Sequence, residues 1–397
     1  MKLLFIQGGS RVRVCKNGNK YVDGNFNNAI WNRYKSYCTE LTVILRQIEK
    51  TFNEEELNNR FNVIDTGIMQ LKLVDDIYSP KKNYFNLRLR RKIDRIIEEE
   101  VIKADKVIIR SVGNFYTNTA LKYCKKYKKD YLIEVTGFAF EGLWYHSIIG
   151  KIVAIPREIK LRRSIKKAPF AVYVTNYSLQ KRYPCLGKTL GCSDVELEKF
   201  SNDTIQRRLE KINNYDKKQE LVLGTAAFLD VKWKGQQDVI RALYKIKKMS
   251  ERKYIYELIG AGTGKRLKKL IKKYRLENEV KIIGVKKHED VFKWLNEIDI
   301  YIQPSYQEGL CRAIVEAMST SCPCLASNVG GNYELLNDKF IFKKGNINQI
   351  VDKIIKISDM KVLIQSSKDN YNNSRIYEKS ILDKKRDAFY NSFVNTR

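Results

Sequence analysis

Short apolar runs alternate with longer amphipathic stretches along most of the chain. Such runs are typical of buried β-strands when polar or turn-forming residues bound them, and the amphipathic stretches are typical of helices. In the first half, the expected strands are residues 3–6, 42–45, 107–110, 131–135 and 171–174. The expected helices between them are residues 27–38, 87–101 and 117–128. Strands that alternate with helices predict parallel β-α-β units, with both faces of the sheet covered.

The pattern weakens and then restarts in the second half. Residues 198–220 are mostly polar and charged, and we interpret them as the connection between two domains. The second series of expected strands is residues 221–226, 255–259, 281–283, 298–303, 323–326 and 339–342. Its expected helices are residues 236–249, 264–274, 288–296 and 313–319, and His288 is interpreted as a helix start. The sequence therefore predicts α/β domains over residues 1–197 and 221–374, and a final helix, residues 375–397, that packs back on the first domain.

Length and fold class together predict that the functional residues lie in a cleft. A chain of 397 residues is long enough for two domains with cores of their own. Each domain is expected to be Rossmann-like, and open parallel sheets of this kind bind ligands beyond the carboxyl ends of their strands. Two such domains that face each other predict a cleft lined by the loops that follow the strands.

The loop after the expected strand 298–303 carries the densest set of candidate binding residues. A turn leads to Glu308 and Gly309, and a helix is expected within a few residues. Glycine lets the backbone approach a ligand closely, and the N–H groups at a helix start bind anions. Glu316 lies one to two turns into this helix, so two carboxylates can address one ligand from different depths.

A glycine pair follows the next expected strand, 323–326. Gly330 and Gly331 suggest another close approach of the backbone to a ligand. Loops after successive parallel strands open on the same edge of a sheet, so the sequence predicts a nucleotide pocket between this loop and the preceding one.

Together these residues resemble the hallmark of glycosyltransferase family 4, in which two glutamates separated by seven residues are followed by a Gly-Gly loop. Glu308 and Glu316 have that spacing. The stretch around Lys234 resembles the lysine loop of the family, and the ordered set of similar motifs covers residues 221–336. The resemblance implies GT-B architecture, with two Rossmann-like domains across a cleft. It also implies a retaining transferase that uses a nucleoside diphosphate sugar.

The resemblance assigns roles on the donor side. In the family, the second glutamate, here Glu316, binds the ribose, and the first, here Glu308, lies as a catalytic residue near the donor sugar and diphosphate. Backbone amides hold the phosphate and the sugar, and here they belong to Gly309, Leu310, Cys311 and Arg312. The glycines expected beside the nucleotide are Gly260, Gly262, Gly330 and Gly331.

Lys234 is expected to neutralise the leaving diphosphate, which is usually the largest catalytic contribution in such a reaction. Many members of the family carry an arginine about six residues before that lysine, but Phe228 stands there in this chain. Lys232 is the candidate for the second positive charge. Because the protein supplies the positive charge, the resemblance implies neither a metal ion nor a cofactor, with the nucleotide sugar as co-substrate.

The acceptor side offers fewer signals. Gly8 with Gly9, and Gly24 with Asn25, are interpreted as glycine loops that meet the donor phosphates across the cleft. Members of the family often carry a histidine on the catalytic side after a strand of the first domain. His146 is the nearest histidine to that place and is the candidate catalytic residue there.

The strong basic charge points to an anionic partner. The chain holds 75 Lys and Arg against 45 Asp and Glu, a formal net charge of +30. The densest basic run extends from Lys151 to Lys167 and follows an aromatic-rich stretch, as at a peripheral membrane surface; the alternative is a solvated helix. The resemblance implies a glycan or lipid-linked acceptor in bacterial surface-polysaccharide synthesis. We therefore expect a cytoplasmic protein that lies on the inner face of the cell membrane.

Other functions remain as alternatives. A sugar-nucleotide epimerase or a phosphorylase could share the architecture, but the extra carboxylates or the pyridoxal-phosphate lysine that these need are not identifiable in the sequence. Only the charge suggests a nucleic-acid binder, since no binding module of that class is recognisable, and no specific nucleic acid is expected as a partner. The eight cysteines lack metal-type spacing and predict reduced thiols.

Overall fold

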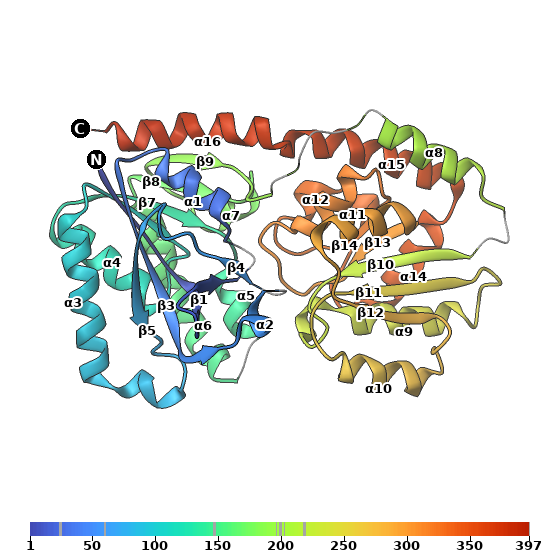
Figure 1. The fold of residues 1–397 in the computed structure, drawn as a ribbon. Coiled ribbons are helices and arrows are strands. Elements are labelled where there is room, and N and C mark those ends of the chain that lie inside the picture. The colour runs from blue at the N-terminus through green and yellow to red at the C-terminus, as the bar shows by residue number, and fades with distance from the viewer. Residues whose placement is uncertain are drawn as a thin grey trace.

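The computed structural model describes residues 1–396 apart from positions 24–25, 59–60, 146–147, 196, 198–200, 202 and 217–219. Two α/β domains lie side by side, each built around its own sheet (Figure 1). The sequence prediction of two sheets with mainly parallel strands is therefore confirmed.

The sheet of the first domain has the order β4-β2-β1-β6-β7-β8-β9, and β3 and β5 continue it from β1. Its strands are β1 (Lys2–Cys15), β2 (Lys20–Val22), β3 (Glu40–Phe52), β4 (Asn62–Val63), β5 (Gln70–Asp75), β6 (Lys106–Arg110), β7 (Asp130–Val135), β8 (Phe170–Tyr173) and β9 (Lys188–Gly191). Its helices are α1 (Asn28–Lys35), α2 (Glu54–Leu57), η1 (Lys81–Phe85), α3 (Leu87–Lys103), α4 (Phe115–Lys126), α5 (Ala139–Trp144), α6 (Ile148–Lys166) and α7 (Ser178–Arg182).

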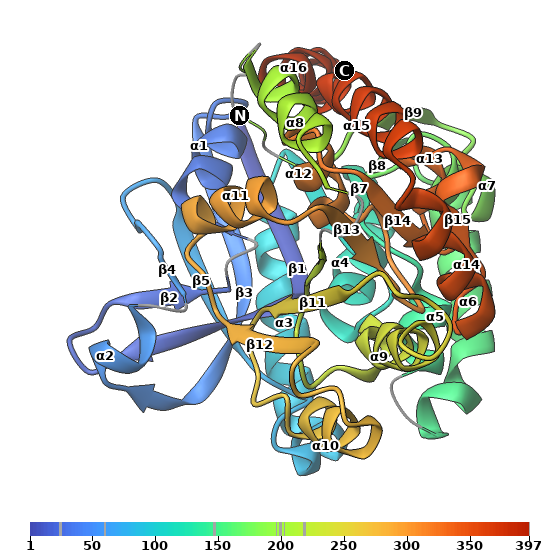
Figure 2. The ribbon, with the colours of Figure 1, turned by 90° about the vertical axis from the view of Figure 1, so that its right-hand side faces the viewer.

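Strand β1 does not end where the sequence predicts. Gly8 and Gly9 lie within the strand, at a register shift between Ile6 and Arg11, rather than in a loop. Gly8 is tightly packed, because a Cβ there would lie 2.2 Å from the side-chain oxygen of Asn114. Beyond the shift, β1 continues beside β3 and pairs with β2, and Figure 2 shows β2 and α2 standing out to one side of the molecule.

The sheet of the second domain is wholly parallel, with the order β12-β11-β10-β13-β14-β15. Its strands are β10 (Leu221–Ala226), β11 (Tyr254–Ile259), β12 (Val280–Gly284), β13 (Ile300–Gln303), β14 (Cys324–Ser327) and β15 (Ile341–Phe342). Its helical segments are η2 (Lys232–Lys234), α9 (Gln236–Ile246), α10 (Lys265–Tyr274), α11 (His288–Glu297), α12 (Arg312–Ser319), α13 (Asn332–Leu335), η3 (Asp338–Phe340), α14 (Ile347–Ile357) and α15 (Met360–Ser374). The strand order reverses between β10 and β13, which is the place where such sheets bind ligands.

The polar connection over residues 198–220 contains a helix, α8 (Asp203–Asn213). Arg208 on this helix is buried, and its guanidinium donates hydrogen bonds of 2.6 Å to the carbonyls of Leu295 and Ile298. Because these carbonyls lie at the end of α11 and just after it, α8 is part of the second domain and not a free linker.

The chain returns to the first domain at its end, through η4 (Arg375–Tyr377) and α16 (Lys379–Val394). The N–H of Lys379 donates a 2.9 Å hydrogen bond to the carbonyl of Leu197, so the two crossings between the domains run side by side. Phe389 and Phe393 on α16 pack edge-on against Phe170 of β8. In Figure 1, α16 lies along the top of the first domain.

Candidate functional site

An ion pair lies where the strand order of the second sheet reverses. Lys234 in η2 follows β10, and Glu308 follows the neighbouring strand β13. The ammonium of Lys234 is 2.7 Å from Oε1 of Glu308, and both side chains are largely buried. Burial by itself lowers the pKa of Lys234, but the attraction of Glu308 outweighs it, so the pKa lies above its ordinary value. Lys234 therefore carries a firmly positive charge at the carboxyl edge of the sheet.

Neighbouring side chains hold Glu308 in place. Ser305 Oγ donates a 2.7 Å hydrogen bond to Oε1, and Gln303 Nε2 donates one of 3.2 Å to the same oxygen. Tyr301 in β13 fixes Gln303 in turn, by donating a 2.6 Å hydrogen bond to its Oε1. The carboxylate is thus oriented before any substrate binds, which is the arrangement that electrostatic catalysis needs.

Gly235 allows the lysine turn to meet the loop of Glu308. It has a φ of +79°, and a Cβ at this position would lie 1.9 Å from the carbonyl oxygen of Pro304. The N–H of Tyr306 also donates a 2.7 Å hydrogen bond to the carbonyl of Trp233. This backbone contact explains why a lysine and a glutamate 74 positions apart form one site.

Arg312 at the start of α12 and Glu316 one turn further along it both face the cleft. Burial raises the pKa of Glu316, while the nearby positive charge of Arg312 favours its ionised form. His288 at the start of α11 lines the same cleft, near Glu316. The helix start at His288 was expected, but its place beside Glu316 was not, because only the fold brings the two helices together.

The cleft between the domains has a volume of about 770 Å³. Leu310, Arg312, Glu316 and His288 line it from the second domain. Its lining in the first domain is mainly polar and includes Gln7, Ser10, Arg33, Arg110, Ser111, Thr136 and Asp194. Most of these polar groups carry no sequence motif, so the sequence alone did not point to them.

Arg110 is the central charge of the first-domain wall. Its guanidinium binds both Glu134 and Asp194. Burial alone would raise the pKa of Asp194, but the Arg110 charge lowers it below the ordinary value. Tyr34 donates a 2.7 Å hydrogen bond to Glu134 Oε1, and Tyr390 of α16 donates to the same oxygen. In this wall, the positive charge of Arg110 is therefore balanced by the carboxylates of Glu134 and Asp194.

The paired glycines of the second loop lie against the first loop. A Cβ on Gly330 would lie 2.0 Å from the carbonyl oxygen of Glu308, and the N–H of Gly331 donates a 2.6 Å hydrogen bond to the carbonyl of Gly309. A Cβ on Gly309 would lie 2.4 Å from the carbonyl oxygen of Thr136 in the first domain. These close approaches join the two loops to each other and to the opposite domain.

Gly260 and Gly262 lie after β11 and pack on the loop that follows β10. A Cβ on Gly260 would lie 2.1 Å from the carbonyl oxygen of Ala227, and one on Gly262 would lie 2.8 Å from Oδ2 of Asp230. Phe228 in that loop is 61% exposed. The two glycines therefore set the shape of the edge beside Phe228.

The remaining candidates lie in different surroundings. Cys311 is buried as the N-cap of α12, and Lys232 has an exposed side chain in η2. His146, Gly24 and Asn25 lie outside the described residues. Tyr145, which precedes His146, accepts a 2.8 Å hydrogen bond from Lys344 of the second domain.

Glu334 ties the two domains together. Its carboxylate accepts hydrogen bonds from the backbone N–H groups of Asn176, Tyr177 and Ser178 in the first domain, at 2.7, 3.2 and 2.5 Å. These hydrogen bonds link α13 of the second domain to the segment that leads into α7 of the first domain. The sequence offered no specific signal for this contact, since the partners of Glu334 are backbone groups.

The structure also bears on metals and thiols. Over the described ranges, no group of three or more His, Cys, Asp or Glu side chains is placed to hold a metal ion. All eight cysteines are free thiols. Within the part of the chain that the structure describes, no helix is both long enough and apolar enough to cross a bilayer.

Comparison with known proteins identifies relatives over most of the chain. The family model of glycosyl transferases group 1 matches residues 206–376. Protein CapJ of Staphylococcus aureus is 33% identical over 359 residues, which cover 89% of this chain and 85% of CapJ. The UDP-Gal:alpha-D-GlcNAc-diphosphoundecaprenol alpha-1,3-galactosyltransferase of Escherichia coli is 31% identical over 136 residues, 31% of this chain and 34% of that enzyme.

Solved structures share the fold. The crystal structure of HepE from Anabaena in complex with UDP-glucose superimposes with a TM-score of 0.63 at 17% identity, covering 99% of this chain and 100% of HepE. The predicted GT-B architecture and the predicted family are confirmed. With its site at the reversal of strand order and relatives along its length, this chain belongs to the group 1 glycosyl transferases.

Proposed function

We propose that this glycosyltransferase is a retaining enzyme, which moves a sugar from a nucleoside diphosphate sugar to a lipid-linked glycan during the synthesis of a surface polysaccharide. Its relatives support the substrates: the Escherichia coli galactosyltransferase is named for UDP-Gal and a diphosphoundecaprenol acceptor, and HepE was solved with UDP-glucose. Further partial relatives are named as glycosyltransferases of amylovoran and colanic acid biosynthesis. These relatives support a role in polysaccharide synthesis, and the site residues of this chain support the proposed reaction.

The observation that carries the proposal is the Lys234–Glu308 pair at the reversal of strand order. Departure of a nucleoside diphosphate builds negative charge, and a fixed ammonium stabilises it where it develops. In this role Lys234 acts on the leaving group, and Glu308 lies near the donor sugar. Since Lys234 and the start of α12 supply the positive charge, we expect transfer without a metal ion.

The donor nucleotide is proposed to bind along the edge of the second sheet. Glu316 binds the ribose hydroxyls, and the backbone N–H groups of residues 309–312 bind the phosphates. Lys232 adds a second positive charge in place of the arginine that Phe228 replaces. The four glycines proposed to border the nucleotide are Gly260, Gly262, Gly330 and Gly331.

The acceptor is proposed to bind on the first-domain wall of the cleft. The polar side chains of Gln7, Ser10, Ser111 and Asp194 suit the hydroxyl groups of a sugar. His146, Gly24 and Asn25 remain proposed members of this wall, with His146 as the candidate catalytic group.

The membrane surface is proposed to lie on α6. Ile152, Ile155 and Ile159 are exposed on this helix at spacings that place them on one face. Basic residues from Lys151 to Lys167 flank them, and an apolar stripe bordered by cations is typical of helices that lie on anionic bilayers. The protein is thus proposed to work at the inner face of the cell membrane.

Vesicle binding tests this surface. The protein should co-sediment with phosphatidylglycerol vesicles but not with phosphatidylcholine vesicles, and Ile155→Glu should weaken that binding by about tenfold because it places a negative charge in the apolar stripe. Ile381→Glu, at an exposed isoleucine of α16, is the matched control. Equal sedimentation of the Ile155→Glu variant would remove α6 as the docking face.

Turnover of a nucleotide sugar tests the catalytic proposal. Thermal-shift measurements with UDP- and GDP-sugars first select the donor, because a bound ligand stabilises the fold. Lys234→Met should then lower the rate of donor turnover by about 10²–10³-fold. Lys232→Met should have a smaller effect, about tenfold, and the exposed Lys268→Met should have none. Addition of EDTA should leave the rate unchanged. A fully active Lys234→Met variant would refute the assignment.

A further inference from the structure

A second cavity, of about 340 Å³, adjoins the cleft on the side of α5 and α6. It shares two lining residues with the cleft, Ser111 and Thr136, whose hydroxyl oxygens lie 2.6 Å apart. Its size falls within the range of about 300–1,000 Å³ that is usual for ligand sites. The cavity therefore opens beside the proposed acceptor wall, and a pair of hydroxyl groups marks the junction.

The walls of this cavity are mainly apolar. They include Val112, Val135, Phe138, Leu143, Leu161 and Ile165. Three glycines also line it, and nothing lies within 4 Å of the Cβ position at Gly113, Gly137 or Gly142. The absence of side chains at these positions leaves the space open, whereas the glycines of the donor loops are pressed against neighbouring backbone.

A cationic depression adjoins the cavity. Gly113 and Arg157 also line the adjacent depression, whose other members include Arg90, Lys122 and Lys160. Arg157 and Lys160 belong to α6, the helix with the exposed isoleucine stripe. From the cleft outward, the surface therefore changes from polar hydroxyl groups to an apolar cavity and then to a basic rim. In this rim, Lys160 lies beside Ile159 of the isoleucine stripe, whereas Arg157 lies on the opposite side of α6.

We propose that this cavity holds the hydrocarbon segment next to the phosphate in a lipid-linked acceptor. The order of surfaces matches the order of groups in such a molecule: the saccharide and its phosphate at the hydroxyl junction, the lipid chain in the cavity, and the anionic bilayer at the basic rim. The cavity keeps the first part of the lipid chain out of water after that part leaves the bilayer, and covering this apolar surface favours binding. This inference rests on the proposed lipid-linked acceptor and locates its lipid subsite.

Gly142 provides a way to close the cavity without disturbing the backbone. It lies within α5 and outside the left-handed region of backbone space, so a side chain there is not strained. Gly142→Leu would fill the open space in front of it, and Gly142→Ala adds a single methyl group as the matched control. Both substitutions favour the helix, because glycine is the weaker helix former.

Binding of farnesyl diphosphate to the full-length protein tests the proposal, with inorganic diphosphate and UDP as comparison ligands. The wild-type protein should bind farnesyl diphosphate at least about tenfold more tightly than inorganic diphosphate. Gly142→Leu should remove that advantage, Gly142→Ala should keep most of it, and neither should change the affinity for UDP.

Two results would overturn the lipid subsite: farnesyl diphosphate that binds no better than inorganic diphosphate, or an advantage that survives in Gly142→Leu. Unchanged UDP affinity in the variants shows that the fold and the donor site are intact. Failure of donor turnover to depend on Lys234 would instead contradict the proposed function, so the two ideas fail in different experiments.

Discussion

The two walls of the cleft are built in different ways. On the wall formed by the second domain, called the donor wall for its proposed role, Glu308 is fixed by Ser305 and Gln303, which lie three and five positions away in the sequence. Its longer-range partner, Lys234, is delivered by a short turn directly after the neighbouring strand. The donor wall is therefore a set of local motifs, each tied to the end of one strand.

On the wall formed by the first domain, called the acceptor wall for its proposed role, distant segments meet in one network. Arg110 of β6 binds Glu134 of β7 and Asp194, and Glu134 also accepts hydrogen bonds from Tyr34 of α1 and Tyr390 of α16. No pair of these residues forms a recognisable sequence motif. The donor side chains are therefore fixed mainly by near neighbours in the sequence, whereas the first-domain network depends on contacts between distant segments.

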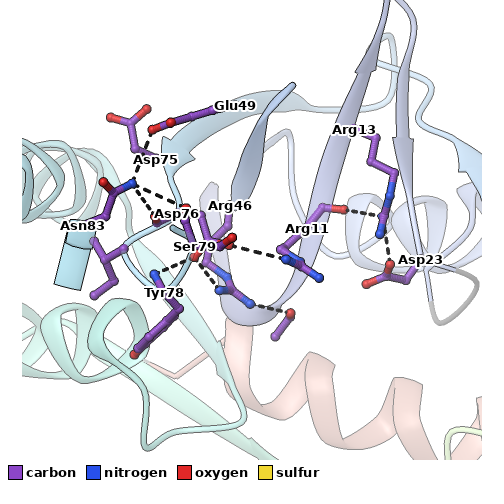
Figure 3. A network of polar contacts seen from close by, with 12 residues as sticks. Arg11, Arg13, Asp23, Arg46, Glu49, Asp75, Asp76, Tyr78, Ser79 and Asn83 are labelled. Carbon is purple, nitrogen blue, oxygen red and sulfur yellow. Dashed lines mark hydrogen bonds and ion pairs between the residues drawn. The ribbon is translucent and has the colours of Figure 1, made fainter. Parts of the chain in front are cut away.

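A second long-range network lies on the same domain, where β1 and β3 continue past the glycine pair. Arg46 donates hydrogen bonds to Oδ1 of Asp76 at 2.8 Å and to the carbonyl of Gly9 at 2.7 Å. The N–H of Tyr78 donates a 2.8 Å hydrogen bond to the same carboxylate oxygen. Figure 3 shows Arg46 and Arg11 approaching Asp76. The Arg46–Asp76 pair is almost fully buried, with 9% and 2% of the side chains exposed.

The largest expected effect comes from breaking this pair. Asp76→Ala leaves the Arg46 charge buried without its carboxylate, and the loss of one partner of a buried pair costs about 3–5 kcal/mol. Denaturant unfolding should show that loss in the first domain, while UDP affinity of the folded protein stays unchanged, because the donor site lies on the other domain. Asp75→Ala is the control, since its partner Lys92 is 64% exposed. Similar losses of stability in both variants would contradict the importance of the buried pair, and a large loss of UDP affinity would contradict the placement of the donor site on the second domain alone.

A smaller effect is expected for Glu316→Gln on the donor wall, and this substitution should raise the stability of the protein rather than lower it. Burial raises the pKa of Glu316, so the folded protein holds that proton more tightly than the unfolded chain does. The ionised carboxylate therefore costs stability once the pH has risen through the raised pKa, and Glu316→Gln removes that cost. The unliganded variant should melt about 1–2 °C higher near pH 7 and equal the wild type near pH 4.

The same variant should bind UDP about tenfold or more weakly, because a charged hydrogen bond to the ribose is lost. Glu289→Gln, at an exposed glutamate of α11, is the control for both measurements. A Glu316→Gln variant that melts lower, or that binds UDP as well as the wild type, would refute the role given to this carboxylate.

The sequence predicted the second domain more accurately than the first. In the second domain, the strand expected at residues 221–226 is β10 itself, and the other expected strands lie close to observed ones, because buried parallel strands read as continuous apolar runs. In the first domain, Gly8 and Gly9 suggested a turn, but β1 continues to Cys15. The alternation of Val12 with Arg11 and Arg13 was the available signal for a half-exposed strand.

For the site, Glu308 and Glu316 could be identified from their spacing, and Lys234 from a stretch that resembles the lysine loop of the family. Arg110, Asp194 and His288 could not, because each reaches the cleft only through packing between elements that are far apart in the sequence. The long-range contact of Glu334 is of the same kind, since its partners are backbone groups of the other domain.

The return of α16 to the first domain makes that domain discontinuous. Besides its aromatic contacts, α16 inserts the buried guanidinium of Arg386 against the carbonyl of Ser193 at 2.8 Å, and Lys106 of β6 donates a 2.7 Å hydrogen bond to the carbonyl of Thr396. A fragment cut between the domains would leave Glu134 without Tyr390 and the Phe170 face uncovered. The first domain is therefore built from two chain segments, and a separately produced first domain would need the final helix as well.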